Sequence, residues 1–269
     1  MFLDGNSLRS NGNTEALWVL QNEYQSLGGD FNIMRRWWVN RYDNITVGGK
    51  RPIAVSIANG GRGLGRIGIT RYALNLYAAG DDRNSPFAIR QYWIINNAAS
   101  LPTGAKLGDT IRTTRTVRER MNDALWPSTR KWDWAPSVAN DVQNSSNYND
   151  QIYLRVADTY LLLAEAQFKL GDLAGAAATI NLLRTRAKAK AITAANVTLD
   201  FILDERSREL ISEEYRRYTL LRNDKWLTRT RLYNALAGPN ITDRDKLLPI
   251  PQSVIDANLT KPFAQNPGY

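Results

Sequence analysis

Two alanine-rich runs separated by a Gly-Asp pair constrain the fold of this chain more than any other feature. Residues 155–170 and 173–188 each place apolar side chains at helical spacing, with Gly171-Asp172 between them. A glycine can adopt the left-handed conformation that ends a helix, and an aspartate can accept the free amides that begin the next one. The pattern predicts two helices joined by a tight turn. Their backbones can approach closely because the facing positions are alanines: Ala164, Ala166, Ala174, Ala176 and Ala177.

A hairpin of this kind is typical of tetratricopeptide-like repeats, which stack on one another to bury their apolar faces. About three or more repeats are normally needed for stability. The sequence holds one convincing copy, so we expect the scaffold to be completed by repeats that this polypeptide does not supply. The predicted fold class is mainly α, a tetratricopeptide-like helical hairpin scaffold with long irregular loops.

Three regions follow one another along the chain. Residues 1–150 are irregular and rich in aromatic side chains, and we expect this loop-rich region to face the ligand. Residues 151–226 show the only sustained helical periodicity and form the helical scaffold. Residues 227–269 are predicted to form an extended C-terminal strap packed across the helices, because their prolines disfavour helix.

Within the helical region, residues 199–226 predict one long helix with a charged face. Asp204 with Arg208 and Glu213 with Arg217 are four residues apart, a spacing that favours ion pairs on an exposed helix surface. We interpret these carboxylates as a solvated helix face and assign them no chemistry.

Histidine and cysteine are both absent from the 269 residues. Their absence removes imidazole bases, thiolate nucleophiles, disulfides and most zinc, copper and haem ligands. We therefore expect a non-catalytic protein with no cofactor and no bound metal. No run approaches the ~18 uncharged apolar residues of a membrane-spanning helix. The net charge of +9 is compatible with a nucleic acid, an acidic ligand or anionic lipid headgroups as a partner.

Residues 63–68 read Gly-Leu-Gly-Arg-Ile-Gly and match the G-x-G-x-x-G motif of dinucleotide-binding proteins. The motif follows a strand-like stretch at 52–57 and precedes a helix-like stretch at 69–79. A dinucleotide fold also needs an acidic residue at the end of the next strand and further parallel strands. Asp81 and Asp82 instead come before the next strand candidate. We interpret the motif as a structural loop, with a dinucleotide-binding enzyme fragment as the less favoured alternative.

Eight tryptophans are present, several in loop-like stretches beside amides and guanidinium groups. Sugar rings have flat apolar C–H faces and a rim of hydroxyls, so a sugar site needs exposed aromatic rings beside such donors. A single tryptophan is expected in the core, but the set together predicts at least one exposed platform. The same mixture could stack nucleobases, yet acidic residues interrupt the basic stretches and no nucleic-acid partner is expected. The candidate ligand-binding residues are Trp37, Trp38, Tyr42, Trp93, Trp132, Trp134, Arg36 and Asn40.

In their order and spacing, several segments resemble the C-terminal portion of the SusD/RagB family of outer-membrane nutrient-binding lipoproteins. The resemblance covers nearly the whole chain, 1–269, as the C-terminal portion of one SusD-like domain. The segments that carry it are Glu15-Ala16-Leu17-Trp18, Gly61-Arg62-Gly63, Asp81-Asp82-Arg83, residues 154–166 with Gly171-Asp172, Leu203-Asp204-Glu205-Arg206 with Arg208-Glu209-Leu210, Leu248-Pro249-Ile250-Pro251-Gln252 and Asn266-Pro267-Gly268-Tyr269.

This resemblance implies a partial SusD-like fold and a non-catalytic protein exposed at the cell surface, on the outer membrane. Such a protein captures oligosaccharides for uptake through a SusC-like TonB-dependent transporter; a peptide-binding member of the family is the alternative. Family members carry an N-terminal lipid anchor, which is absent from this chain, and membrane association is expected only through it. Family binding residues vary between members, so the aromatic candidates above rest on their chemistry alone.

Overall fold

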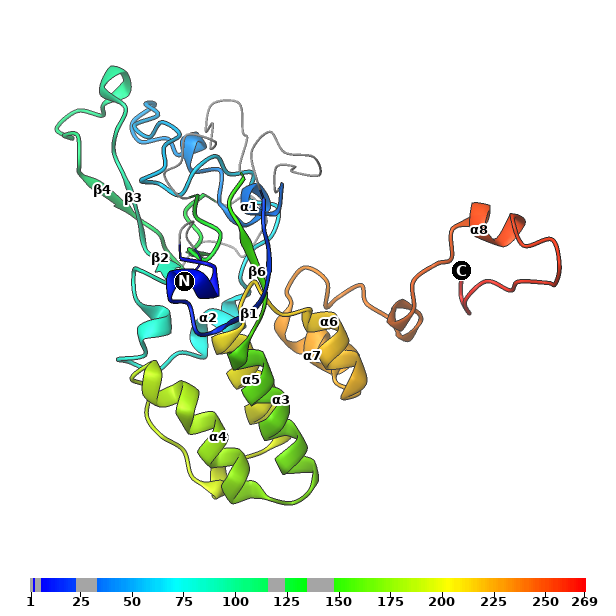
Figure 1. Ribbon diagram of the computed structural model, residues 1–269. Helices are drawn as coiled ribbons and strands as arrows, with labels where there is room; N and C mark the ends of the chain where they lie inside the picture. Colours follow the sequence, from blue (N-terminus) through cyan, green and yellow to red (C-terminus); the bar gives the residue numbers. More distant parts are fainter. Residues whose placement is uncertain (1, 3–5, 23–32, 116–123, 135–147) are drawn as a thin grey trace. The chain divides into compact units, whose positions relative to one another are not determined.

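A computed structural model describes residues 2, 6–22, 33–115, 124–134 and 148–269 of the protein. The chain forms two compact units, residues 1–214 and residues 215–269. Figure 1 shows the elements of both units coloured along the sequence.

The helical hairpin forms as the sequence predicts. Helix α3 (Val156–Lys169) and helix α4 (Leu173–Arg186) are joined by Gly171, whose φ of +83° is the left-handed value expected at the end of a helix. The Asp172 carboxylate caps α4 by accepting a hydrogen bond from the Gly175 amide at 2.7 Å. The expected turn and cap are therefore confirmed (Figure 1).

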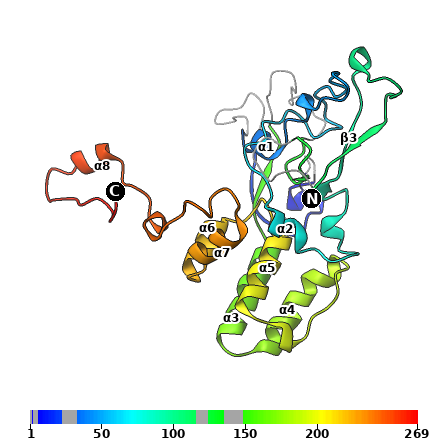
Figure 2. The same cartoon turned by 180° about the vertical axis from the view of Figure 1, so that it is seen from behind.

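A third helix completes the scaffold of the first unit. Helix α5 (Leu199–Glu209) begins at the Thr198 cap and packs against α3, after a short 3-10 turn, η5 (Ala194–Asn196). Figure 2 shows α3, α4 and α5 together from behind. Full burial of a leucine or isoleucine contributes about 1.5–3 kcal/mol, so the apolar core holds the three helices together. It consists of Ala157, Leu161, Ala164, Ala176, Ala177, Ile180, Leu183, Val197, Ile202 and Leu210.

The prediction of one long helix over residues 199–226 is wrong. Helix α5 ends at Glu209, and Ser212 adopts a left-handed φ of +64°. The physical reason is an ion pair between Arg206 and Glu214. In a continuous helix these two residues would be about 12 Å apart along the axis, so the chain must turn back to join them.

Short antiparallel ribbons join distant parts of the first unit. Strand β1 (Ala16–Leu20) pairs with β6 (Gln151–Arg155), which leads directly into α3. Strand β2 (Ile89–Arg90) pairs with β5 (Ser128–Thr129), and β3 (Tyr92–Ile94) pairs with β4 (Thr110–Arg112). Among the described residues every ribbon has two strands, so the parallel sheet of a dinucleotide-binding fold is not formed there.

Two small aromatic cores hold the irregular region between residues 33 and 134. One joins Tyr42 and Trp93 to nearby aliphatic side chains, and the other is centred on Trp126, whose indole NH donates to the Ile69 carbonyl at 2.8 Å. Large rings bury much apolar area per residue, which lets a chain with few regular elements keep a core. The regular elements of this region are α1 (Ile33–Trp38), α2 (Arg71–Asn75), η2 (Tyr42–Asn44), η3 (Asp82–Asn84) and η4 (Ala98–Ser100), with η1 (Arg9–Asn11) before them.

The second unit contains α6 (Arg216–Arg222), α7 (Trp226–Tyr233), η6 (Asp243–Lys246) and α8 (Gln252–Asp256). The Arg217 guanidinium lies over the Trp226 ring and donates to the Asp245 carbonyl at 2.6 Å. The tail is extended around its prolines, as expected, and is held locally by two hydrogen bonds between Gln265 and Ile250. The strap across the helices stays a prediction. In the part of the chain that the structure describes, no helix is long and apolar enough to cross a membrane.

The glycine motif at 63–68 lies against the C-terminal end of α1. The Leu64 amide donates to the Arg36 carbonyl at 2.6 Å, and the Ile67 amide donates to the Trp37 carbonyl at 3.0 Å. Amides engaged in this way cannot cradle a phosphate, as the amides of a nucleotide-binding loop must. The motif is thus a packing loop, which agrees with the structural interpretation.

The glycines are required by close contacts. A Cβ atom at Gly63 would lie 2.0 Å from the Asn40 carbonyl oxygen. At Gly61, where φ is +86°, a Cβ would lie 2.2 Å from Cγ of Trp134. Both positions therefore exclude any side chain.

We expect Gly61→Ala and Gly63→Ala each to lower the free energy of unfolding by about 2–4 kcal/mol, because both are overpacked and Gly61→Ala is also strained by its left-handed φ. Gly68→Ala is the matched control, since a Cβ there meets open space. Its expected change is within about 1 kcal/mol. Denaturant titration of the three variants checks this, and equal stability of Gly63→Ala and Gly68→Ala would contradict it.

Candidate functional site

Three of the candidate residues are consecutive in α1, next to the glycine loop. Trp37 is exposed, with 37% of its surface accessible. Arg36 and Trp38 on either side of it are half-buried, and Trp38 packs against the Trp126 core. Of the predicted tryptophans, Trp37 offers the most ring surface to a solute.

The rings of Tyr42 and Trp93 do not form a ligand platform, because they are stacked on each other inside the core. Their centroids are 4.5 Å apart with an interplanar angle of 23°, and both side chains are fully buried. The Tyr42 hydroxyl donates to the Gly61 carbonyl at 2.6 Å, and the Trp93 indole NH donates to the Ala124 carbonyl at 2.9 Å. Burial raises the pKa of Tyr42. Both residues stabilise the irregular region.

Asn40, Trp132 and Trp134 are also buried. The Asn40 amide donates to the Trp126 carbonyl at 2.6 Å, and the Trp132 indole NH donates to the Ser212 carbonyl at 3.2 Å. Trp134, only 1% exposed, has its ring against the Gly61 backbone. These candidates are corrected to core positions, since loops without sheets or long helices need large side chains to fill their interior.

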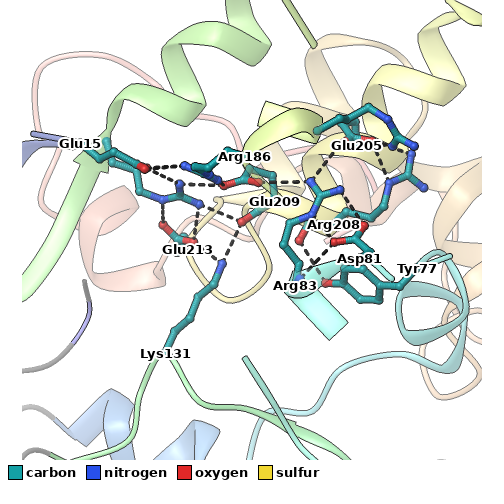
Figure 3. A network of polar contacts seen from close by, with 12 residues as sticks. Glu15, Tyr77, Asp81, Arg83, Lys131, Arg186, Glu205, Arg208, Glu209 and Glu213 are labelled. Carbon is teal, nitrogen blue, oxygen red and sulfur yellow. Dashed lines mark hydrogen bonds and ion pairs between the residues drawn. The ribbon is translucent and has the colours of Figure 1, made fainter. Parts of the chain in front are cut away.

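A second cluster of functional groups, which we call the Glu209 network, was not predicted as a unit. Figure 3 shows it. Glu209 accepts from Arg155 at 2.8 Å, from Arg83 at 3.2 Å and from Arg186. Lys131 donates to the Glu209 carbonyl at 2.8 Å. The signal in the sequence was the interleaved arginines and glutamates of residues 203–217, which we had interpreted as a solvated face.

Two further carboxylates extend the network. Glu205 pairs with Arg83, Arg184 and Arg208 at 2.7–2.8 Å. Glu213 pairs with Arg155 at 2.6 Å and with Lys131. The partners differ from the predicted pairs, because these side chains are buried: Arg208 pairs with Glu205, and Glu213 pairs with Arg155 and Lys131. Of the members, Glu205 is 0% and Glu209 2% exposed, so the expectation of a solvated face is wrong.

The remaining members of the predicted pairs have other partners. Asp204 accepts a hydrogen bond from the Tyr72 hydroxyl at 2.7 Å. Arg217 lies in the second unit and donates to backbone carbonyls there. The two ion pairs predicted from a spacing of four residues are therefore wrong.

The network fixes the ionisation of its central carboxyl. Burial alone would raise the pKa of Glu209, but the positive charges of Arg155, Arg186, Lys131 and Arg83 lower it to about 2. For Lys131, burial lowers the pKa, and the charge of Arg155 acts in the same direction. Glu209 is thus a permanent anion at neutral pH.

A cavity of about 280 Å³ borders the network. Phe2, Tyr77, Ile89 and Ile211 form much of its wall, together with the charged groups already described. Because those charged groups are paired with one another, the cavity offers few free donors to a ligand. We assign the Glu209 network to stability: it ties the loop at 81–83 and Lys131 to the ends of β6, α4 and α5.

Removal of the central charge is expected to be costly. Glu209→Gln leaves buried guanidinium groups uncompensated and should lower the free energy of unfolding by about 3–5 kcal/mol. Asp82→Asn is the control, because it breaks the exposed Lys188–Asp82 pair at 3.0 Å. Such surface pairs contribute about 0–1 kcal/mol. Urea titrations measure both variants, and similar losses would refute the assignment.

The same carboxyl predicts a pH dependence. Its folded pKa of about 2 lies below the unfolded value of about 4.3. The stabilisation is therefore fully present above the unfolded pKa and is lost as the pH falls from about 5 towards 2. The stability difference between wild type and Glu209→Gln should shrink over that range when unfolding is measured at successive pH values. A constant difference from pH 7 to 3 would be inconsistent with the lowered pKa.

Comparisons with known proteins identify the family to which this chain is similar. The sequence model of the SusD family matches residues 14–269. A curated relative, SusD-like protein P25 of Formosa agariphila, is 34% identical over 146 residues, which cover 48% of this chain and 27% of the relative.

Solved structures share the same fold. The surface glycan-binding protein A of Bacteroides fluxus has a TM-score of 0.63 at 22% identity, covering 100% of this chain and 54% of that one. The protein of the same name from Bacteroides thetaiotaomicron, in complex with laminarihexaose, has a TM-score of 0.62 at 20% identity, covering 99% and 55%. The chain therefore spans about half the length of these structures. With the family model matched over nearly all of its length and the fold shared with these proteins, the chain belongs to the SusD family.

Proposed function

We propose that this protein captures oligosaccharides without catalysis at the cell surface and hands them to a SusC-like TonB-dependent transporter in the outer membrane. Family membership supports the proposal, as do two matched structures that are described as surface glycan-binding proteins. The observation in this chain that carries it is the exposed side chain of Trp37, with the half-buried Arg36 next to it in the sequence. A lipid anchor of the kind used in the family would hold the protein at the membrane.

The chemistry of this face suits a sugar. The apolar face of a pyranose ring can lie on an indole, while guanidinium N–H groups donate to its hydroxyls. Trp37 is held in place because its carbonyl accepts the Ile67 amide and its helix is backed by the glycine loop. A fixed ring loses little conformational entropy when a ligand binds. In this proposal the irregular region faces the ligand and the helices are its scaffold.

Isothermal titration with a panel of plant, host and microbial oligosaccharides tests the proposal. We expect Trp37→Ala to weaken binding about 10- to 100-fold, the equivalent of about 1.4–2.8 kcal/mol. Phe87→Ala is the matched control, because Phe87 is a more exposed aromatic on a different loop. Loss of binding in Phe87→Ala with none in Trp37→Ala would move the site away from α1.

Two alternatives give different results in the same assay. A peptide-binding member of the family would bind peptides but none of the oligosaccharides, and substitution of Trp37 would not weaken its peptide binding. A dinucleotide-binding enzyme fragment would be protected against melting by NAD or NADP. The engaged amides of the glycine loop argue against this second alternative.

A further inference from the structure

The excess positive charge of this chain is concentrated around α1 and the glycine loop. Residues 33–70 hold seven basic residues and one acidic residue, a net +6 of the +9 for the whole chain. By contrast, residues 148–214 hold eight basic and ten acidic residues. The seven are Arg35, Arg36, Arg41, Lys50, Arg51, Arg62 and Arg66, against Asp43.

These basic residues differ in what they contact. Arg35 is buried and donates to the backbone carbonyls of Asp133 and Asp150. Arg41 and Arg66 are exposed, and neither pairs with a carboxylate of the described residues. The basic side chains of the Glu209 network, in contrast, are all matched by carboxylates. The region around α1 and the glycine loop, which we call the α1 face, therefore offers the exposed charges of Arg41 and Arg66 to a ligand.

Backbone hydrogen bonds bring the two basic segments together. The Leu64 amide is bonded to the Arg36 carbonyl, and the Gly65 amide to the Val39 carbonyl at 2.8 Å. Arg62 and Arg66 flank this bonded stretch. Arg36 and Arg62 are close enough to repel, since burial and then the charge of Arg62 lower the pKa of Arg36.

One donor at this face has no acceptor in the fold. Nε of Arg36 is buried and makes no hydrogen bond within the described residues. Leaving such a donor unsatisfied costs about 1–3 kcal/mol. An anionic group bound to the accessible part of this half-buried side chain would offset that cost and would also relieve the repulsion between the guanidinium groups.

We propose that the α1 face selects acidic oligosaccharides, whose anionic substituents bind Arg36 and Arg66 while a sugar ring stacks on Trp37. The inference rests on the proposed function, because it names the class of glycan for the same site. A uronate carboxylate and a sulfate ester share the required chemistry: each offers two or more oxygens to the planar fork of an arginine. A neutral glycan would offer no anionic partner to these two guanidinium groups.

Calorimetric titration with neutral, uronate-containing and sulfated oligosaccharides of equal length tests this on the whole chain. At low salt at least one acidic class should bind 10-fold or more tightly than the neutral set. The preference should fall at about 0.5 M salt, where the Debye length is only a few ångströms. The two acidic classes distinguish a carboxylate from a sulfate ligand.

Variants that remove one positive charge test whether the preference for acidic ligands arises at the α1 face. Arg66→Gln should weaken acidic ligands about 3- to 10-fold and leave neutral ones unchanged, the size of effect that one partly screened pair gives. Lys190→Gln is the matched control, because it removes one exposed positive charge from the loop after α4. Thermal melts of both variants check that folding is intact.

The remaining outcomes separate a failure of this inference from a failure of the proposed function. Equal affinity for neutral and acidic sets overturns this inference and leaves the proposed function standing, whereas no binding to any glycan overturns both. Equal weakening by Lys190→Gln would mean a general charge effect and overturn the site. Tight binding of a single-stranded oligonucleotide at the same face would show unselective polyanion capture and also refute the inference.

Discussion

The buried carboxylate of Glu209 is the interaction on which the first unit of this protein depends. It forms ion pairs with Arg83, Arg155 and Arg186. These arginines lie in the loop before β2, at the end of β6 and at the end of α4. Segments far apart in sequence are thus fixed to one helix end. Because an unpaired buried charge is far more costly than an exposed one, the irregular region cannot separate from the helices without a large loss of free energy.

Because these ion pairs hold the irregular region to the helices, it keeps its structure with only short helices and strands. Its ribbons are two or three residues long, and its interior is filled instead by rings such as those of Tyr42, Trp93 and Trp126. Glycines at 61 and 63 allow the backbone to pass within contact distance of the Trp134 ring and of the Val39 and Asn40 carbonyls. Many aromatic residues of the region are buried in this way, whereas Trp37 stays exposed, as do Phe87 and Tyr92.

Arginine has different partners in the helical scaffold and around α1. Arginines of the scaffold are matched by carboxylates and contribute to the fold, whereas residues 33–70 hold six arginines and one lysine against one acidic residue. Such a division is expected if one part of the molecule must stay rigid while another meets a solute. The proposed preference for acidic glycans follows from this unequal distribution of charge.

Local signals in the sequence determined the helical hairpin, its Gly171 turn and its Asp172 cap, because these depend on residues a few positions apart. The order of the motifs also determined the family. Tertiary structure alone decided which tryptophans are exposed and which glutamates are buried, since burial depends on segments 50 to 150 residues away. Tyr42 and Trp93 have the composition of a sugar platform and yet form core, and residues 203–214 have the pattern of a solvated face and yet form the central ion-pair network. In both cases the deciding partner lies on another segment, which no local pattern encodes.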